Sequence, residues 1–358
     1  EPQVIHGRLM LESGWIEARN SACFNLYRSP AIPAGDPDQA GPWIDHVRKL
    51  YPDEADHLMR WFAYKIQFPG EKVNHAVVLG GRQGVGKDVL LEPVKRAVGE
   101  GNVAGIAPKD VIDKFNGFVQ SVLLVINEAT DLGELDGKTF YEASKTLIAA
   151  PPHVIQCNVK FRPHRNVQNV CGVVITTNHK TDGIYLHPDD RRHFVAWSPV
   201  ERSDFAADYF LNLHRWYESG GYGHVAAFLR AMDLSDFDAK APPPKTAAFW
   251  EIVQSDQAPE DAELADSLDR LGRPEAVTIS TLAAAAKGLD LAYWLQDKRS
   301  RRQIPHRLET AGYVQVRNDA ASDGLWRVGG KRQAVYARKD LLARARVMAA
   351  DALCRGGR

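Results

Sequence analysis

Residues 76–88 run Ala76-Val77-Val78-Leu79-Gly80-Gly81-Arg82-Gln83-Gly84-Val85-Gly86-Lys87-Asp88. The aliphatic run at its start predicts a buried strand, and the aliphatic residues that follow Lys87 recur at helical spacing. Between strand and helix lies the G-x-x-x-x-G-K spacing of a phosphate-binding P-loop, from Gly81 to Lys87. Its glycines let several backbone N–H groups turn inward around one anion, and Lys87 reaches the β- and γ-phosphates. The alternative is a glycine-rich turn with an incidental lysine.

One residue of this loop departs from the usual pattern. Asp88 stands where a Ser or Thr normally ligates Mg²⁺. A carboxylate binds Mg²⁺ directly, but without the metal it repels phosphates. We therefore expect ATP binding that depends strongly on Mg²⁺. The predicted ATP-phosphate ligands are Gly81, Arg82, Gln83, Gly84, Val85, Gly86, Lys87 and Asp88.

Two further apolar runs end in polar residues. Residues 122–126 predict a central strand buried on both faces and lying beside the P-loop strand, and Asn127 and Glu128 follow it. Glu128 is the candidate general base or water-orienting residue, and Asn127 a candidate to hold the water shell of Mg²⁺, so the predicted metal site is Asp88, Asn127 and Glu128. The run 171–175 predicts a third strand, after which Asn178 could hydrogen-bond the γ-phosphate or the attacking water.

Basic residues gather in two places between and after these strands. Residues 154–167 predict a β-hairpin whose tip suits the phosphates and bases of single-stranded nucleic acid, unless it is simply a solvated turn. The tip carries Lys160, Phe161, Arg162, His164 and Arg165. Arg191 and Arg192 precede another strand-like run, and an arginine can stabilise a transferring phosphoryl group, often from a neighbouring subunit. For at least one of them, a buried ion pair with an aspartate is the alternative.

The composition is ordinary for a soluble globular protein, with 44% hydrophobic and 25% charged residues. No apolar run approaches the length of a membrane span. Four cysteines without metal-like spacing favour reduced thiols and a cytoplasmic setting. The formal net charge of zero conceals an asymmetry, because residues 298–358 carry fifteen basic and five acidic residues. This excess favours a polyanion partner for the C-terminal end, the alternative being a solvated basic tail.

The chain divides into five predicted regions. A helical N-terminal region (1–70) is followed by a parallel α/β core (71–235), a Pro-rich linker (236–246), a small domain (247–340) and a basic tail (341–358). In the small domain, helices precede two strand-like runs, 313–317 and 325–328, that flank a polar turn. This order suggests a winged helix with a basic hairpin, whose recognition helix begins near Pro305. Its candidate DNA ligands are Arg299, Arg301 and Arg302.

Taken in order, these motifs resemble the superfamily-three helicases of the AAA+ class that occur in phage and plasmid primase–helicase proteins. Residues 81–88 resemble motif A, 122–128 motif B, 145–164 the B-prime region with its DNA-binding hairpin, and 173–178 motif C with sensor Asn178. Residues 190–192 resemble the region of the arginine finger. Asp88 and Asn127 depart from the family at two metal-handling positions.

The resemblance implies a P-loop AAA+-like core and an ATP-dependent, 3′→5′ translocating DNA helicase in a bacterial host's cytoplasm. It also implies a homo-oligomeric ring, commonly hexameric, on single-stranded and forked DNA. Any primase domain would lie upstream of Glu1 in a longer polypeptide. An ATP-regulated initiator or loader that grips DNA without unwinding it stays open, as does a small-molecule kinase, which would need neither the basic hairpin tip nor the basic C-terminal module.

Overall fold

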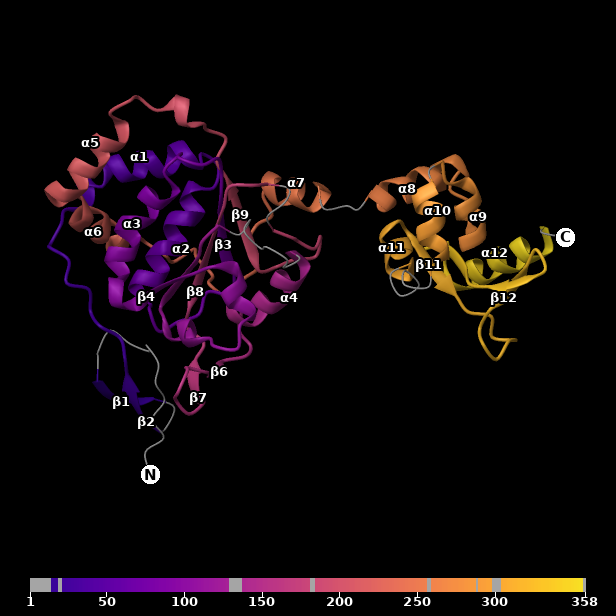
Figure 1. The fold of residues 1–358 in the computed structure, drawn as a ribbon, viewed down its shortest axis with the longest axis horizontal. Helices are drawn as coiled ribbons and strands as arrows, with labels where there is room; N and C mark the ends of the chain where they lie inside the picture. Colours follow the sequence, from indigo (N-terminus) through magenta and orange to yellow (C-terminus); the bar gives the residue numbers. More distant parts are fainter. Residues whose placement is uncertain are drawn as a thin grey trace. The chain divides into compact units, whose positions relative to one another are not determined.

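A five-stranded parallel sheet lies at the centre of the first of two units in this computed structural model (Figure 1). The structure describes residues 14–18, 21–128, 137–180, 184–255, 259–287, 289–297 and 304–356. The two units are Glu1–Asp256 and Gln257–Arg358. No helix among these residues is long and apolar enough to cross a bilayer.

The sheet order is β4–β5–β8–β3–β9, and every neighbouring pair is parallel. The strands are β3 (Ala76–Gly80), β4 (Val103–Ile106), β5 (Leu123–Ile126), β8 (Gly172–Thr177) and β9 (His193–Trp197). The predicted parallel α/β core is therefore present. The expectation that β5 neighbours the P-loop strand was wrong, because β8 lies between β3 and β5. A crossover connection can skip a position in the sheet, so chain order does not fix strand order.

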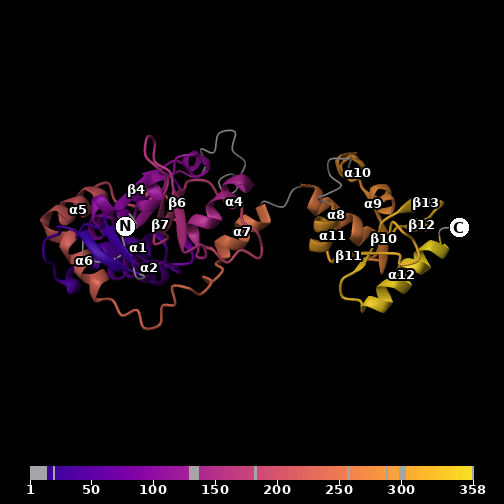
Figure 2. The ribbon, with the colours of Figure 1, turned by 90° about the horizontal axis from the view of Figure 1, so that it is seen from below.

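Helices cover both faces of this sheet, as Figures 1 and 2 show. Alternate side chains of β3 point to opposite faces. Val77 and Leu79 join one core with α1 (Gly41–Leu50), α2 (Ala55–Gln67), α3 (Lys87–Val98) and α6 (Tyr222–Ala231). Ala76 and Val78 join a second core with α4 (Gly137–Ile148) and α7 (Ala247–Ser255). The predicted helices of the N-terminal region are present, and they share a core with the sheet.

Smaller elements complete the first unit. An N-terminal hairpin pairs β1 (Gly14–Ala18) with β2 (Ser21–Asn25). The helical stretch after β9 consists of α5 (Tyr209–Trp216) and α6, joined by a kinked segment (Tyr217–Gly221) in which Ser219 and Gly220 are not helical. Short 3₁₀ helices span Pro37–Gln39, Glu100–Asn102, Pro108–Ile112, Gly117–Gln120 and Arg202–Asp204. The predicted basic hairpin is formed by β6 (Val154–Cys157) and β7 (Arg165–Gln168).

The Pro-rich linker is part of the first unit. Ala239 is buried, and its carbonyl accepts a hydrogen bond from the Asn74 N–H (2.8 Å). Thr246 donates its hydroxyl to the Val195 carbonyl at 2.7 Å, and α7 then packs on the sheet. The two compact units divide at Asp256–Gln257, after this segment.

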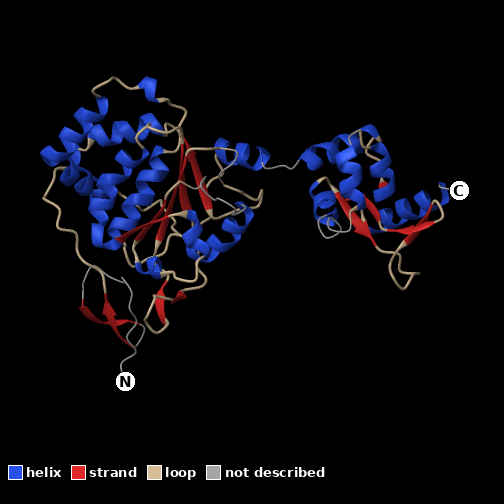
Figure 3. Cartoon of the chain, viewed as in Figure 1, coloured by secondary structure: helices blue, strands red, loops and turns tan. Residues whose placement is uncertain are grey.

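The second unit contains both helices and antiparallel strands (Figure 3). Its elements in order are α8 (Pro259–Arg270), β10 (Ala276–Thr278), α9 (Ile279–Ala285), α10 (Leu289–Gln296), α11 (Ile304–Thr310), β11 (Tyr313–Val316), β12 (Trp326–Val328), β13 (Lys331–Gln333), β14 (Val335–Arg338) and α12 (Ala343–Gly356). One sheet has the order β10–β14–β11, and β12 pairs with β13.

Two details of this unit differ from the sequence analysis. The runs 313–317 and 325–328 do not pair with each other, because β11 pairs with β14 and β12 with β13. The predicted basic tail forms α12, which buries Ala349 and Ala350 against β10 and β14. The helix α11 begins at Ile304, next to Pro305, as expected. The winged-helix assignment stays a prediction.

Candidate functional site

The loop between β3 and α3 has the backbone of an anion cradle. Gly81, Gly84 and Gly86 have φ angles of 148°, 79° and 96°, which favour glycine. Gly86 directly precedes α3, whose first residue is Lys87. The first N–H groups of a helix lack partners within the helix and carry partial positive charge. This loop therefore presents backbone donors where a phosphate group can bind.

Close packing explains two glycines of the loop. A Cβ at Gly80 would lie 2.1 Å from the Trp197 ring, and one at Gly81 would lie 2.7 Å from Ser198 Cβ. The segment after β9 therefore lies directly against the start of the loop. Gly80 is therefore required by packing against Trp197.

Lys87 links the loop after β3 to Asn178, the residue that follows β8. Its side chain is buried, and Nζ donates hydrogen bonds to Gly81 O (2.5 Å), Arg82 O (3.0 Å) and Asn178 Oδ1 (2.7 Å). Burial lowers the pKa of Lys87 to about 8, while the carboxylates of Asp88 and Glu128 oppose this shift. The ammonium therefore bonds to neutral oxygens that an incoming phosphate can replace.

Glu128 and Asn127 end β5 on the same edge of the sheet. Both side chains are exposed, and the Glu128 N–H donates to Thr176 Oγ1 at 3.2 Å. Glu128 has φ = 51°, a left-handed conformation that costs energy in a residue other than glycine and recurs at functional sites. Its influence on the Lys87 pKa means that its carboxylate lies within electrostatic range of the ammonium.

Metal binding at this edge would rely on few protein ligands. Within the described part of the chain, no group of three or more His, Cys, Asp or Glu side chains is arranged to hold a metal ion. Asp88 and Glu128 supply carboxylates, and Asn127 supplies an amide oxygen. Mg²⁺ takes one or two carboxylates and fills its remaining positions with water and substrate phosphates. These residues therefore fit Mg²⁺ bound together with a nucleotide.

Arg191 and Arg192 lie at the opposite end of the sheet, where the strands begin. The Arg192 carbonyl accepts a hydrogen bond from the N–H of Ala76, the first residue of β3, at 2.8 Å. The five residues of β3 span about 16 Å, so these arginines start roughly that far from the P-loop. The structure thus brings Lys87 and Asn178 into contact, with Glu128 at the same edge of the sheet, but leaves both arginines at the opposite end.

The neighbouring carboxylate of Asp190 is buried and has other partners. Asp190 Oδ1 accepts from the backbone N–H groups of Arg192 and His193, both at 2.9 Å, and Oδ2 accepts from the Tyr141 hydroxyl at 2.9 Å. Burial alone would raise the pKa of Asp190, but the hydrogen bonds of His193, Arg192 and Tyr141 hold it well below its usual range. No ion pair of Arg191 or Arg192 occurs among the residues with described positions.

Side chains that the sequence analysis did not single out also border the P-loop. Arg82 pairs with Glu201 at 3.2 Å. The aliphatic part of Arg202 lies near Gly84, and its guanidinium lies over the Phe210 ring, 4.9 Å from the centroid. Glu201 and Arg202 belong to no sequence motif; they lie in the segment after β9, where a short 3₁₀ helix begins at Arg202.

The back of the loop contacts α1. His46 Nε2 lies 3.0 Å from Gly86 O, and Nδ1 lies 3.1 Å from the Tyr209 hydroxyl. Burial lowers the pKa of His46, which favours the neutral ring. Nε2 then donates to Gly86 and Nδ1 accepts from Tyr209, so one imidazole links the P-loop to both α1 and α5.

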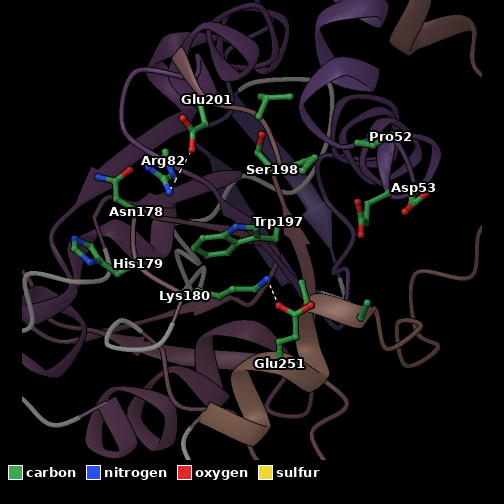
Figure 4. A pocket seen from close by; sticks show the side chains of 15 residues that line it. Pro52, Asp53, Arg82, Asn178, His179, Lys180, Trp197, Ser198, Glu201 and Glu251 are labelled. Carbon is green, nitrogen blue, oxygen red and sulfur yellow. Dashed lines mark ion pairs between the residues drawn. The ribbon is translucent and has the colours of Figure 1, made fainter. Parts of the chain in front are cut away.

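A pocket of about 650 Å³ opens beside the loop (Figure 4). Arg82 and Asn178 line it on one side, and Trp197 and Glu201 belong to its wall. Lys180 forms an ion pair with Glu251 of α7 at its far end. The pocket therefore borders both the P-loop and the predicted sensor.

The β6–β7 hairpin displays an aromatic side chain to solvent. Phe161 is 93% exposed and has φ = 63°. Lys160 Nζ lies 5.1 Å from the Phe161 ring centroid. Arg162 and His164 are exposed at the same tip, and Arg165 is half-buried. The other predicted DNA ligands, Arg299, Arg301 and Arg302, lie outside the described residues.

Comparisons with known proteins agree with the fold. A family of unknown function, DUF5906, matches residues 79–192. No curated protein matches the chain. The apo structure of the NrS-1 C-terminal region (305–718) is 14% identical with a TM-score of 0.64, covering 94% of this chain and 85% of that one. Its A form gives a TM-score of 0.62 at the same identity and coverage.

The alignment with a structure of JCV helicase covers 66% of this chain and 65% of that one, at 13% identity. Its TM-score of 0.35 is too low to establish a shared fold. The likeness to the NrS-1 region, in contrast, extends over nearly the whole chain. At this identity it establishes a common fold.

Proposed function

We propose that the chain is an ATP-dependent DNA helicase of the superfamily-three class, acting as a ring in replication of a phage, plasmid or related element in a bacterial cytoplasm. The observation that carries the proposal is the bond between Lys87 Nζ and Asn178 Oδ1 at 2.7 Å. It joins a P-loop lysine to a polar residue that follows the adjacent strand, at the edge of the sheet where Glu128 also lies.

In this proposal each residue has a separate task. The loop N–H groups and Lys87 bind the β- and γ-phosphates, Asn178 orients the γ-phosphate or the attacking water, and Glu128 accepts the proton of that water. Mg²⁺, when bound, neutralises phosphate charge. Asp88 and Glu128 would hold it, with Asn127 bonding its water shell.

The hairpin tip is the proposed contact with single-stranded DNA. An exposed phenylalanine side chain is unfavourable in water, and its left-handed backbone conformation costs further free energy. Stacking on a base would offset both costs, and the nearby Lys160, Arg162 and His164 suit the phosphates. Substituting Lys160 and Phe161 is expected to separate ATP hydrolysis from strand displacement.

Three measurements on the full chain test the proposal: ATP hydrolysis with and without single-stranded DNA, displacement of a strand from a fork, and the mass of the assembly. We expect DNA-stimulated hydrolysis and displacement that needs both ATP and Mg²⁺. Hydrolysis and DNA binding without displacement would favour the initiator or loader. Phosphorylation of a small molecule without DNA binding would favour the kinase.

The two arginines are proposed to act on the site of a neighbouring subunit, because their own P-loop lies at the other end of the sheet. A variant with Arg191→Ala and Arg192→Ala, mixed with Lys87→Ala, should recover hydrolysis at interfaces that combine an intact loop with intact arginines. Mixed assemblies no more active than either parent would point to a structural role.

A further inference from the structure

The β12–β13 hairpin of the second unit ends in a tight glycine turn. Val328 is opposite Lys331, so Gly329 and Gly330 form a two-residue connection. Their φ angles are 57° and 76°, and the turn type that best fits twisted strands needs positive φ at both positions. A Cβ at either glycine would have no atom within 4 Å, so the turn projects into open space.

The base of the hairpin is fixed to the unit. Trp326 is buried among Val335, Ala337 and Ala350, and its Nε1–H donates to Val316 O at 2.8 Å. Across from it, Gln333 Oε1 accepts from the Ser280 hydroxyl of α9 at 2.8 Å. A two-stranded hairpin is only marginally stable alone, so these contacts are what hold it in position.

The projecting part carries an excess of positive charge. Arg327 and Arg332 are direct cross-strand partners, and Lys331 follows the turn; all three are exposed. Like charges directly opposite each other destabilise a pair of strands. Asp323 pairs with Arg332 at 2.5 Å, but no acidic partner of Arg327 or Lys331 occurs within the described part of this unit. A bound anion would relieve this repulsion.

We infer that the β12–β13 tip binds the backbone phosphates of duplex DNA, an inference that rests on the proposed function. Several cations on a narrow, rigidly based projection suit a regular array of phosphates. A membrane is a poorer partner, because Trp326 is buried and Val328 half-buried, which leaves no large exposed apolar side chain on the hairpin.

The test removes two charges from the tip and compares it with a matched control. The tip variant carries Arg327→Gln and Lys331→Gln. The control carries Arg273→Gln and Lys339→Gln in the same unit, where the side chains pair with Asp269 and Glu309. Each variant of the full chain is titrated over a range of salt concentrations with a short fluorescent duplex and, separately, with a single strand of the same length.

We expect the tip variant to bind duplex more weakly and its log–log salt slope to fall by about 2 units, since each phosphate contact contributes about 0.9. The control should keep the slope of the unmodified protein. Asp323→Asn should tighten binding, because it frees Arg332 from its partner; this gain cannot come from misfolding.

Equal losses in the tip and control variants would overturn the inference in favour of a general charge effect. A loss confined to single-stranded DNA would overturn the assignment to duplex. ATP hydrolysis without DNA should be the same in all variants. If hydrolysis and unwinding persist but the tip variant binds duplex normally, the inference fails and the proposed function stands; absent hydrolysis in the unmodified protein would count against the proposed function.

Discussion

If the loop binds ATP as proposed, the burial of Lys87 should set an upper pH limit on that binding. Its pKa is lowered to about 8, so it loses its proton below the range of an ordinary lysine. Only the ammonium attracts phosphates, and the apparent Kd equals the intrinsic one divided by the protonated fraction. That fraction is roughly nine-tenths at pH 7 and roughly one-tenth at pH 9 for such a pKa. We therefore expect the Kd for ATP to rise about tenfold between these pH values.

The assay is a titration with a fluorescent, non-hydrolysable ATP analogue at constant Mg²⁺ and ionic strength. Lys87→Arg is the control, because a guanidinium stays charged throughout this range. It should bind more weakly but without the pH dependence. Asn178→Asp would put a carboxylate near Lys87 Nζ, where an amide oxygen now lies at 2.7 Å, and should move the transition to higher pH. A constant Kd in the unmodified protein, or an equal rise in Lys87→Arg, would refute the reasoning.

Three other substitutions probe the same edge of the sheet. Glu128→Gln should retain ATP binding but lose hydrolysis, since only the water-activating carboxylate is removed; near-normal turnover would contradict its role. Asp88→Ser should restore part of the ATP binding that chelation of Mg²⁺ abolishes, and equal metal dependence in both proteins would argue against phosphate repulsion. Gly80→Ala places a methyl group 2.1 Å from the Trp197 ring and should lower stability by about 1–3 kcal/mol or more in thermal or urea unfolding. A fully stable Gly80→Ala would mean that the ring can move aside.

The parts of the site that lie close together in the chain could be predicted from the sequence. A buried strand, a glycine turn and a helix follow one another in residues 76–98, so local pattern suffices to place Lys87. The positions of Asn178 and Glu128 could be predicted because the carboxyl ends of parallel strands lie at one edge of the sheet. That geometry holds whatever the order of the strands. Because β8 lies between β3 and β5, the neighbours of β3 differ from those expected. Asn178 and Glu128 nevertheless lie at the predicted end of the sheet.

Contacts between distant segments could not be predicted in the same way. His46 reaches Gly86, and Glu201 reaches Arg82, only because α1 and the segment after β9 pack against the loop. No periodicity in either segment encodes that meeting. The strand 313–316 illustrates the same limit: its alternation predicts a strand, but the partner proved to be β14, whose residues follow the glycine turn.

The position of Arg191 and Arg192 gives the strongest reason to consider an assembly. Asp190 fixes the backbone of this segment through hydrogen bonds to the N–H groups of Arg192 and His193. Asp190 also accepts a hydrogen bond from the Tyr141 hydroxyl and lies 3.1 Å from His193 Nδ1, and the side chain of Arg191 is exposed. This exposed cation starts about 16 Å from its own P-loop, which favours a proposed role at the site of another subunit. In the proposed ring it would act on the nucleotide site of another subunit. Loss of activity in a single variant cannot distinguish that role from a structural one. Complementation in mixed assemblies is therefore the decisive observation for these two residues.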